Sequence, residues 1–273
     1  MNRLKVVPKN QGIYMNLTKK FVLFNQYLYS RPFLAKGTQS KEVFWPGCSA
    51  MKLDPEIFDK TYDIFKKHNP EMGLSTFCCS KPTLAIGSEK QKNARQTELQ
   101  DYYKWSGVET IYTLCTNCFN TLPNSFSGKV VSAWPIVAEY VKKNPGKAYE
   151  FDDIYKLHDP CSTRKEREIH KVTREILDER EVAIMEFSCN QSKTLCCGRQ
   201  NMCFVTNKEA SKKIWKLREK DLDDKPILTY CESCVEAFRG HYKEAYHLLE
   251  VVFNQKVKRN ILNKFKIIRK VFK

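Results

Sequence analysis

The sequence lacks an uninterrupted apolar stretch of the roughly 20 residues that a membrane-spanning helix needs, so we do not expect a spanning protein. The apolar stretch that follows Lys19 and Lys20 is interrupted by Asn25 and Gln26, and no small-residue cleavage site comes after it. A secretory signal peptide is therefore not predicted, and we expect a cytoplasmic protein.

Motifs of several enzyme classes are absent as well. There is no G-x-G-x-x-G fingerprint, phosphate-binding P-loop or hydrolase nucleophile elbow, so dinucleotide binding, nucleotide binding and serine hydrolysis have no support. The C-x-x-C-x-x-C-x-x-x-C-P run of a ferredoxin module is also missing. The composition, with 42% hydrophobic and 29% charged residues, excludes general disorder, and 273 residues suit one large or two small domains.

Acidic residues are scarce at both ends of the chain. Residues 1–42 carry eight Lys or Arg and a single acid, Glu42, and residues 251–273 carry eight Lys or Arg and no acid. Of the formal net charge of +16, only +1 therefore belongs to residues 43–250. Because a dedicated nucleic-acid binder carries its basic surface on the folded body, no nucleic-acid partner is predicted. Residues 1–42 are interpreted as a basic N-terminal extension.

The C-terminal segment, residues 251–273, has the pattern of a basic amphipathic helix. Apolar residues recur at every third or fourth position between the basic ones, namely Val257, Ile261, Phe265, Ile268 and Phe272. Such a helix can lie on an anionic membrane surface, or it can pack on the body of the protein or on a partner. Peripheral membrane association through this helix is therefore one of two alternatives.

Cysteine, in contrast, is abundant. In a reducing compartment, twelve cysteines are more often metal ligands or catalysts than disulfide partners. Ten of them form two copies of one pattern: a single cysteine, an adjacent pair and a C-x-x-C motif. The first copy comprises Cys48, Cys78, Cys79, Cys115 and Cys118, and the second comprises Cys161, Cys196, Cys197, Cys231 and Cys234. This repeat indicates two similar domains, residues 43–150 and 151–250.

The residues between the cysteines predict the fold of each copy. Short apolar or β-branched runs lead into the cysteines, as in EVFWPGC and YKLHDPC, and indicate strands. Helices are expected between them, one starting at Asp54-Pro55 and one running from near Ser88 to Gly107. The alternation predicts an α/β fold of two tandem, internally repeated domains with mainly parallel sheets. Because ligands bind beyond the carboxyl ends of such strands, the three cysteine groups of each copy are expected to converge.

Five thiols per copy are compatible with three kinds of site. A structural zinc ion takes four ligands, one fewer than each copy offers. Disulfides are disfavoured, because adjacent cysteines rarely bond to each other and an odd number of five cysteines per copy leaves one unpaired. An iron–sulfur cluster offers several irons and usually takes cysteine ligands. The spacing therefore favours iron–sulfur, while zinc and free redox-active thiols stay open as alternatives.

The complete pattern resembles the cysteine-rich CCG domain found in the cysteine-rich subunit of heterodisulfide reductase. It is similar, too, to iron–sulfur subunits of glycolate oxidase, lactate-utilisation proteins and thiol–fumarate reductase. The resemblance covers about residues 43–250 and includes all ten motif cysteines. It implies two noncubane 4Fe-4S clusters, one on each set of five cysteines, in an oxidoreductase acting on a thiol/disulfide or an organic acid. It also implies a flavoprotein or a ferredoxin-type protein as electron donor or acceptor.

The two CCG motifs differ at one position. Ser80 stands where the first motif would have glycine, whereas Gly198 keeps the second motif intact. Glycine permits backbone angles that serine resists, so we expect the geometry around the first cluster to be the less regular one. Every predicted thiolate is still present in the first copy.

A few further residues lie near the motifs. We interpret Cys189 and Cys203, which lie outside the repeat, as small buried hydrophobic residues rather than ligands or a substrate-responsive thiol pair. His158, which precedes the second copy's first cysteine by three residues, is a candidate hydrogen-bond partner of the second cluster or a structural residue. Phe44 and Trp45 are expected in the core.

Two other functions compete with the oxidoreductase. One is an electron-transfer or redox-sensing subunit without a substrate of its own, and the other is a zinc-stabilised interaction module. An open cavity of small-molecule size in contact with both clusters would favour the oxidoreductase over the first alternative. Metal analysis distinguishes the oxidoreductase from a zinc-stabilised interaction module.

Overall fold

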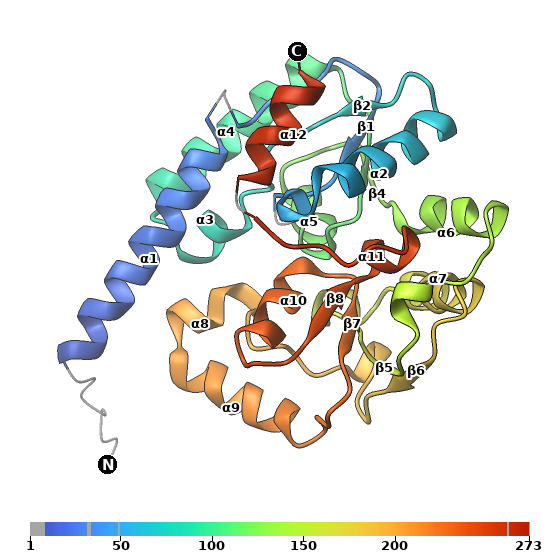
Figure 1. Cartoon of the computed structure of the whole chain (residues 1–273). Helices are drawn as coiled ribbons and strands as arrows, with labels where there is room; N and C mark the ends of the chain where they lie inside the picture. The colour runs from blue at the N-terminus through green and yellow to red at the C-terminus, as the bar shows by residue number, and fades with distance from the viewer. Residues whose placement is uncertain (1–8, 32–33, 49, 261, 273) are drawn as a thin grey trace.

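The computed structural model describes residues 9–31, 34–48, 50–260 and 262–272, and the side chains of these residues except 9–16 and 29. Two α/β units follow one another, with a long helix before them and a short one after them (Figure 1). Each unit has a four-stranded parallel sheet, in the order β2-β1-β3-β4 in the first and β6-β5-β7-β8 in the second. The predicted tandem α/β fold with parallel sheets is confirmed.

The elements of the two units follow the same alternation. The first unit contains β1 (Glu42–Trp45), α2 (Pro55–His68), β2 (Gly73–Leu74), α3 (Lys81–Ile86), α4 (Glu89–Ser106), β3 (Thr110–Thr113), α5 (Thr116–Thr121), β4 (Lys129–Ser132) and α6 (Trp134–Lys143). The second contains β5 (Tyr155–His158), α7 (Arg167–Glu179), β6 (Ile184–Glu186), α8 (Cys203–Thr206), α9 (Lys208–Glu219), β7 (Ile227–Thr229), α10 (Glu232–Arg239), β8 (Ala245–His247) and α11 (Leu248–Val252).

Capping residues fix the helices of the first unit where the sequence predicts them. The Asp54 side chain accepts a hydrogen bond from the backbone N–H of Glu56, at 2.9 Å, and proline follows it at the first helical position of α2. Ser88 begins α4 with a reciprocal capping box, and Gly107 ends it in the left-handed conformation, with φ of +67°.

Strand register shows which residues of the two units are equivalent. Trp45 of β1 lies opposite Thr113 of β3, and His158 of β5 lies opposite Thr229 of β7. Both threonines precede a C-x-x-C motif by two residues. Trp45 and His158 therefore occupy the same place in the two units.

One core joins the two units. Because side chains alternate along a strand, Phe44 packs into this shared core, while Val43 and Trp45 pack into a separate cluster on the other face of the first sheet. Helices α6 and α7 pack against each other across the junction, as do α2 and α11 (Figure 1). The first helix of each unit thus contacts the last helix of the other, which holds the two sheets in a fixed relation.

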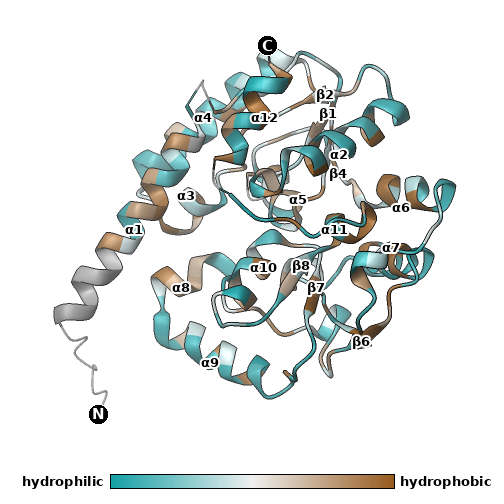
Figure 2. Ribbon diagram, in the orientation of Figure 1, coloured by the Kyte–Doolittle hydropathy of each residue, from teal (hydrophilic) through white to brown (hydrophobic). Residues whose placement is uncertain are grey.

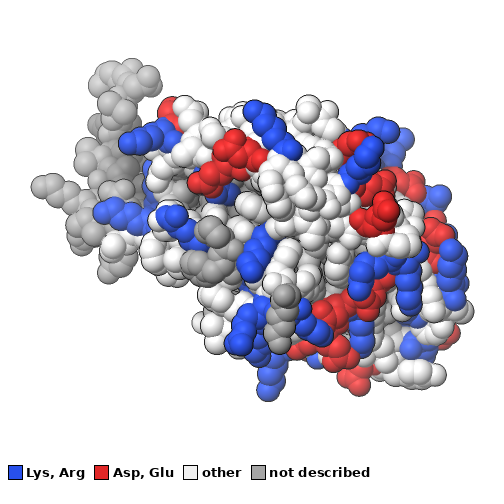
Figure 3. Space-filling model, turned by 90° about the horizontal axis from the view of Figure 1, so that it is seen from above, with Lys and Arg blue, Asp and Glu red and all other residues white. Residues whose placement is uncertain are grey.

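The chain ends add a helix on either side of this body. Helix α1 (Lys9–Tyr29) lies within the predicted N-terminal extension, and α12 (Asn263–Val271) is shorter than the predicted C-terminal helix. Ile267 and Ile268 of α12 are buried in the shared core, and Ile261 lies outside the described residues. None of the helices in the described ranges is long and apolar enough to cross a membrane. On the face in Figure 3, acidic and basic side chains are interspersed over the body.

Candidate metal centres

The cysteines lie where three neighbouring strands of each sheet end. In the first unit, Cys48 follows β1, the pair Cys78-Cys79 follows β2 and Cys115 follows β3. The second unit repeats this arrangement after β5, β6 and β7. Because the strands are parallel, their carboxyl ends meet at one edge of the sheet, and the predicted convergence is observed in both units.

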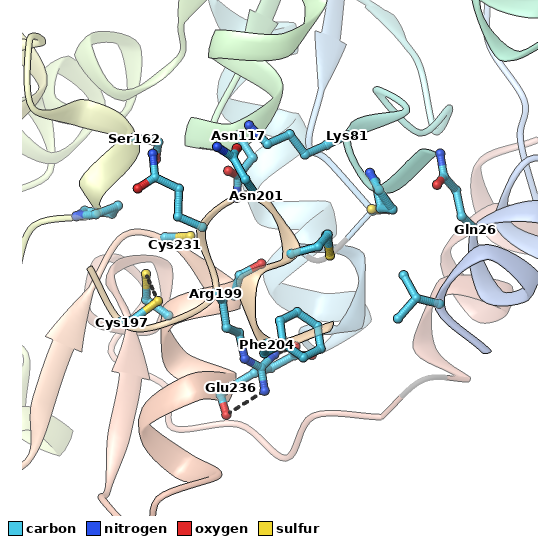
Figure 4. Close-up of a pocket in the computed structure, with 18 of the residues that line it drawn as sticks. Gln26, Lys81, Asn117, Ser162, Cys197, Arg199, Asn201, Phe204, Cys231 and Glu236 are labelled. Atoms are coloured by element: carbon cyan, nitrogen blue, oxygen red, sulfur yellow. Dashed lines mark hydrogen bonds and ion pairs between the residues drawn. The ribbon is translucent and has the colours of Figure 1, made fainter. Parts of the chain in front are cut away.

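The thiols of each unit touch one another in the same order. Successive hydrogen-bonded neighbours in the first quintet are Cys48, Cys78, Cys79, Cys118 and Cys115. Successive neighbours in the second quintet are Cys161, Cys196, Cys197, Cys234 and Cys231. The Sγ atoms of Cys197 and Cys234 are 3.3 Å apart (Figure 4). The structure thus brings the ten cysteines of the repeat together as two equivalent groups of five.

Contacts within the quintets shift the pKa values of the thiols. Hydrogen bonds from Cys118 and Cys78 lower the pKa of Cys79 to about 6, and a hydrogen bond from Cys234 lowers that of Cys231 to about 7. Burial acts in the opposite direction on both groups and favours the neutral thiol. A fully deprotonated quintet would place five negative charges in one buried pocket, which requires a cationic centre.

The donor set fits an iron–sulfur cluster. All twelve cysteines lie in the described part of the chain, and all are free thiols. Five converging sulfurs exceed the four positions of a tetrahedral zinc ion, whereas a cluster of several irons has room for them. The iron core would also supply the positive charge that buried thiolates need. Which cluster type the quintets hold stays a prediction.

Two basic side chains lie beside the first quintet. Lys264 of α12 is fully buried, and burial lowers its pKa. The neighbouring thiols of Cys48 and Cys78 oppose this shift without cancelling it. Arg95 of α4 donates a hydrogen bond to the carbonyl oxygen of Cys78 at 3.5 Å and one to the Ser80 hydroxyl at 3.3 Å. These cations are placed to balance thiolate charge in the first unit.

The second quintet has different neighbours. Arg218 of α9 is fully buried, donates a hydrogen bond to the carbonyl oxygen of Leu195 at 2.7 Å and interacts electrostatically with Cys234 and Cys197. A ring nitrogen of His158 and the sulfurs of these two cysteines all lie within 4.8 Å of one another. Burial lowers the pKa of His158 to about 3, so the imidazole is neutral.

The equivalent residues Trp45 and His158 both have unsatisfied polar atoms. The indole nitrogen of Trp45 and both ring nitrogens of His158 are buried and have no hydrogen-bond partner among the described residues. Trp45 packs in one cluster with Cys79 and Cys118, which are the counterparts of the two cysteines beside His158. Since a buried N–H without a partner is costly, both positions point to an acceptor at the quintets.

The turns before Cys48 and Cys161 are stabilised in different ways. Asp159 accepts hydrogen bonds from Arg174 at 2.9 Å, from the Tyr230 hydroxyl at 2.9 Å and from the Gln191 backbone at 2.8 Å. Although burial raises its pKa, these contacts prevail and lower it, so the carboxylate is charged. The first unit has Pro46-Gly47 at this place, and the φ of Gly47 is +85°. Gly47 lies so close to Cys115 that a Cβ atom added to it would be 2.5 Å from the Cβ atom of Cys115.

Ser80 adopts the backbone conformation that its glycine counterpart adopts. Its φ is +68°, in the left-handed region, and that of Gly198 is +88°. The expected cost of serine at this position is therefore present as backbone strain, while the sulfurs of the first quintet keep the same contacts as those of the second. The hydrogen bond from Arg95 fixes the strained residue in place.

The two cysteines outside the repeat are partly exposed, which corrects their interpretation as buried hydrophobic residues. Cys203 begins α8 and donates a hydrogen bond to the carbonyl oxygen of Asn207 at 3.5 Å. Cys189 lies in the longer connection between β6 and the second adjacent pair. Neither residue belongs to the chain of touching thiols.

A cavity of about 350 Å³ separates the quintets (Figure 4). Six of the ten cysteines line it, namely Cys48 and Cys78 from the first unit and Cys161, Cys197, Cys231 and Cys234 from the second. Glu236 at its wall pairs with Lys52 of the first unit at 2.6 Å and with Arg199 at 2.8 Å. Both quintets therefore face one space of small-molecule size.

Comparison with known proteins finds the same domain twice in this chain. A cysteine-rich domain family, CCG, matches residues 43–123 and 155–239. The chain belongs to the CCG cysteine-rich domain family. A protein of Methanococcus maripaludis described as an uncharacterized iron–sulfur protein is 20% identical over 210 residues, which are 75% of this chain and 42% of that protein. The chain thus spans less than half the length of this CCG relative.

Two solved structures resemble this CCG protein with low TM-scores. Picrophilus torridus aspartate racemase has a TM-score of 0.31 and 10% identity, with 84% of this chain and 99% of the racemase covered. Glutamate racemase from Campylobacter jejuni has a TM-score of 0.33 and 10% identity, with 80% and 87% covered.

Several residues beside the quintets were not found from the sequence. Arg95, Arg218 and Glu236 lie on helices whose patterns gave no reason to single them out. Lys264 had a signal that could have been used: it falls three residues after Ile261 and four before Ile268, within the apolar stripe of the C-terminal segment. A lone cation on an apolar helix face indicates a buried partner of opposite charge.

Proposed function

We propose that this CCG protein is an iron–sulfur oxidoreductase that reduces a small disulfide, with one noncubane 4Fe-4S cluster on each quintet of cysteines. The proposal draws on the resemblance to the cysteine-rich subunit of heterodisulfide reductase and on the description of the Methanococcus relative as an iron–sulfur protein. The observation that carries it is the cavity that sulfurs of both quintets line. An electron-transfer subunit without a substrate has no need of such a space.

The chemistry requires two electrons and two protons, because one disulfide is reduced to two thiols when its S–S bond breaks. Two bound clusters would each supply one electron to the two sulfurs of a disulfide lying between them. A flavoprotein or a ferredoxin-type partner would replace these electrons, since the sequence contains no ferredoxin motif.

The residues of the chain position the two halves of the site. The Ser162 hydroxyl, next to Cys161, donates a hydrogen bond to the Thr116 hydroxyl, next to Cys115, at 2.7 Å. Glu236 joins the units a second time through Lys52. These contacts across the junction fix the separation of the quintets, and a fixed separation is what a reaction that uses both centres on one substrate needs.

The experiment is a thiol assay under anaerobic conditions, with reduced methyl viologen as electron source and bis(2-hydroxyethyl) disulfide as substrate. Asn117 of α5 lines the cavity, whereas Asn124 lies outside its lining and is exposed. We expect Asn117→Trp to abolish thiol formation with the iron content unchanged, because the added indole fills the cavity, and Asn124→Trp to be fully active.

The proposal would be contradicted if the clusters of the wild-type protein accept electrons from viologen but no thiol is formed. This outcome would favour the alternative of an electron-transfer or redox-sensing subunit. Equal activity of both tryptophan variants would show that the reaction takes place outside the cavity.

A further inference from the structure

Helix α1 lies along one edge of the molecule and contacts both units (Figure 1). It packs against α3 of the first unit and α8 of the second. On its inner side, Gln26 is 4% exposed and its side-chain oxygen accepts hydrogen bonds from the backbone N–H and the hydroxyl of Thr83, both at 2.8 Å. The helix is therefore anchored to the body through one face.

The opposite face of α1 is apolar and exposed. Leu17, Phe21 and Phe24, spaced by four and three residues, form one stripe along the helix and are 58%, 66% and 57% exposed. Tyr27, which is 52% exposed, lies in the next turn and stacks with the guanidinium of Arg31 at 3.7 Å. Figure 2 shows apolar and polar residues interspersed along the described part of this helix. Three large apolar side chains in one stripe need a partner surface.

The charge of this segment indicates which surface that is. Residues 1–41 contain eight Lys or Arg and no acid, and Lys20 of α1, which borders the stripe, is exposed. An exposed Leu/Phe stripe within a basic segment is the composition of helices that lie in the plane of an anionic membrane surface. Lys20 would meet the headgroups while the aromatic rings enter the boundary with the acyl chains.

The C-terminal helix does not offer a comparable face. Ile267 and Ile268 of α12 are buried in the shared core, and Lys264 points toward the first quintet. Of the predicted stripe, Ile268 is buried and Val257 and Phe272 pack against the core, which leaves Phe265, 41% exposed, as the one exposed ring among its described residues. Phe21 is the residue of the stripe that lies nearest to the body, and together with Val22 it lines the cavity between the quintets, so docking through α1 brings that cavity close to the membrane surface.

We propose that α1 docks this protein on the surface of an anionic membrane. The stripe of Leu17, Phe21 and Phe24 enters the lipid boundary, and Lys20, at the edge of the stripe, binds lipid headgroups. The inference stands independently of the reaction proposed above, because it rests on a surface outside the CCG domains.

The test is flotation of the full chain with phosphatidylcholine vesicles, with and without phosphatidylglycerol. The α1 variant carries Leu17→Gln, Phe21→Gln and Phe24→Gln. The matched control carries Tyr149→Gln, Leu217→Gln and Tyr242→Gln, at three residues that are 73%, 52% and 100% exposed on other parts of the protein. Circular dichroism of both variants confirms that each is folded.

We expect wild-type and control proteins to float with the phosphatidylglycerol vesicles and not with phosphatidylcholine alone. The α1 variant should bind more than about tenfold less, because three apolar side chains no longer leave water. Added salt should weaken wild-type binding, since headgroup attraction is screened. Absence of wild-type flotation, or equal flotation of both triple variants, would overturn the proposal; the first result would assign the stripe to a protein partner.

Discussion

The two units of this protein arrange five sulfurs in the same way but surround them with different residues. A buried lysine and the indole of Trp45 lie beside the first quintet, and a buried arginine and the imidazole of His158 lie beside the second. The turn before Cys48 depends on a glycine, whereas the turn before Cys161 depends on the hydrogen bonds of Asp159.

This comparison separates what a cluster needs from what adjusts it. The positions of ligands decide whether a cluster is held, while neighbouring charges, hydrogen bonds and burial set its reduction potential. The two units share the first property and differ in the second. Substitutions at equivalent positions of the two units can therefore separate the two properties.

The largest effect is expected from removing one sulfur of each quintet. Cys79→Ser and Cys197→Ser replace equivalent cysteines, each of which touches two other thiols. Because each quintet is predicted to hold one cluster, either variant should lower iron and sulfide to about half of the wild-type content. Anaerobic iron and sulfide assays measure this, and unaltered iron content in both variants would contradict the assignment.

A selective loss of the first centre is expected for Gly47→Ala. The new methyl group would lie 2.5 Å from the Cβ atom of Cys115, at a φ of +85° that alanine resists. The control is Pro160→Ala at the equivalent position, where the backbone has an ordinary φ of −63°. Absorbance and iron content should fall only in the glycine variant; equal iron content in the two proteins would refute the proposed role of Gly47.

The units should also differ in their response to acid. Burial, aided by the charge of Arg259, lowers the pKa of His247 from 6.5 to about 3, while the equivalent residue of the first unit is Ser132. Between these pKa values the unfolded chain binds one more proton, so stability falls as the pH falls. The loss is about 1.4 kcal/mol per pH unit below the unfolded pKa.

His247→Ser should remove this contribution and leave the helix cap, since serine also caps α11. Urea unfolding of the wild type and the variant at pH 5 and pH 7 provides the comparison. The account expects a flatter pH dependence for the variant, and parallel pH curves would speak against it.

A smaller effect is expected at the paired N–H donors. If Trp45 and His158 donate to sulfur, their hydrogen bonds stabilise the more negative, reduced state. Losing one hydrogen bond of about 1 kcal/mol corresponds to a fall of about 40 mV for one electron. Trp45→Phe should therefore lower the potential of the first centre and His158→Phe that of the second.

Redox titration followed by electron paramagnetic resonance distinguishes the two centres in this experiment. Labelling with ¹⁵N-histidine adds a direct signature, because a nitrogen coupling should belong to one centre and vanish in His158→Phe. Potentials that do not move in either variant would show that these buried donors have another role.

The smallest effect is expected at the CCG motifs themselves. Ser80→Gly removes left-handed strain but also the hydrogen bond from Arg95, so the free energy of unfolding should rise by no more than about 1 kcal/mol. The converse change, Gly198→Ser, should lower it by about the same amount. Denaturant unfolding of the two variants decides, and destabilisation by Ser80→Gly would mean that the Arg95 contact outweighs the strain.

Much of this arrangement follows from local patterns. The caps at Asp54 and Ser88 and the apolar runs before the cysteines were sufficient to predict helices, strands and a parallel sheet. Convergence of the cysteines then follows from geometry, because parallel strands have their carboxyl ends at one edge. The repeat extends this reasoning to the second unit.

The remaining features depend on contacts between distant segments. The pattern of the C-terminal segment indicates an apolar face but not what covers it, and only the folded chain shows that Lys264 lies near Cys48, more than two hundred residues away in sequence. The same holds for the contact of Lys52 with Glu236. Exposure of Cys189 and Cys203 also depends on tertiary packing, which composition does not reveal.

The central claim is that each quintet holds an iron–sulfur cluster. Anaerobic quantitation of iron, zinc and acid-labile sulfide, combined with electron paramagnetic resonance of the oxidised and reduced protein, tests it most directly. The account predicts about eight irons and eight sulfides per chain and resonances from two distinguishable clusters. About two zinc ions per chain, without iron or sulfide, would contradict it.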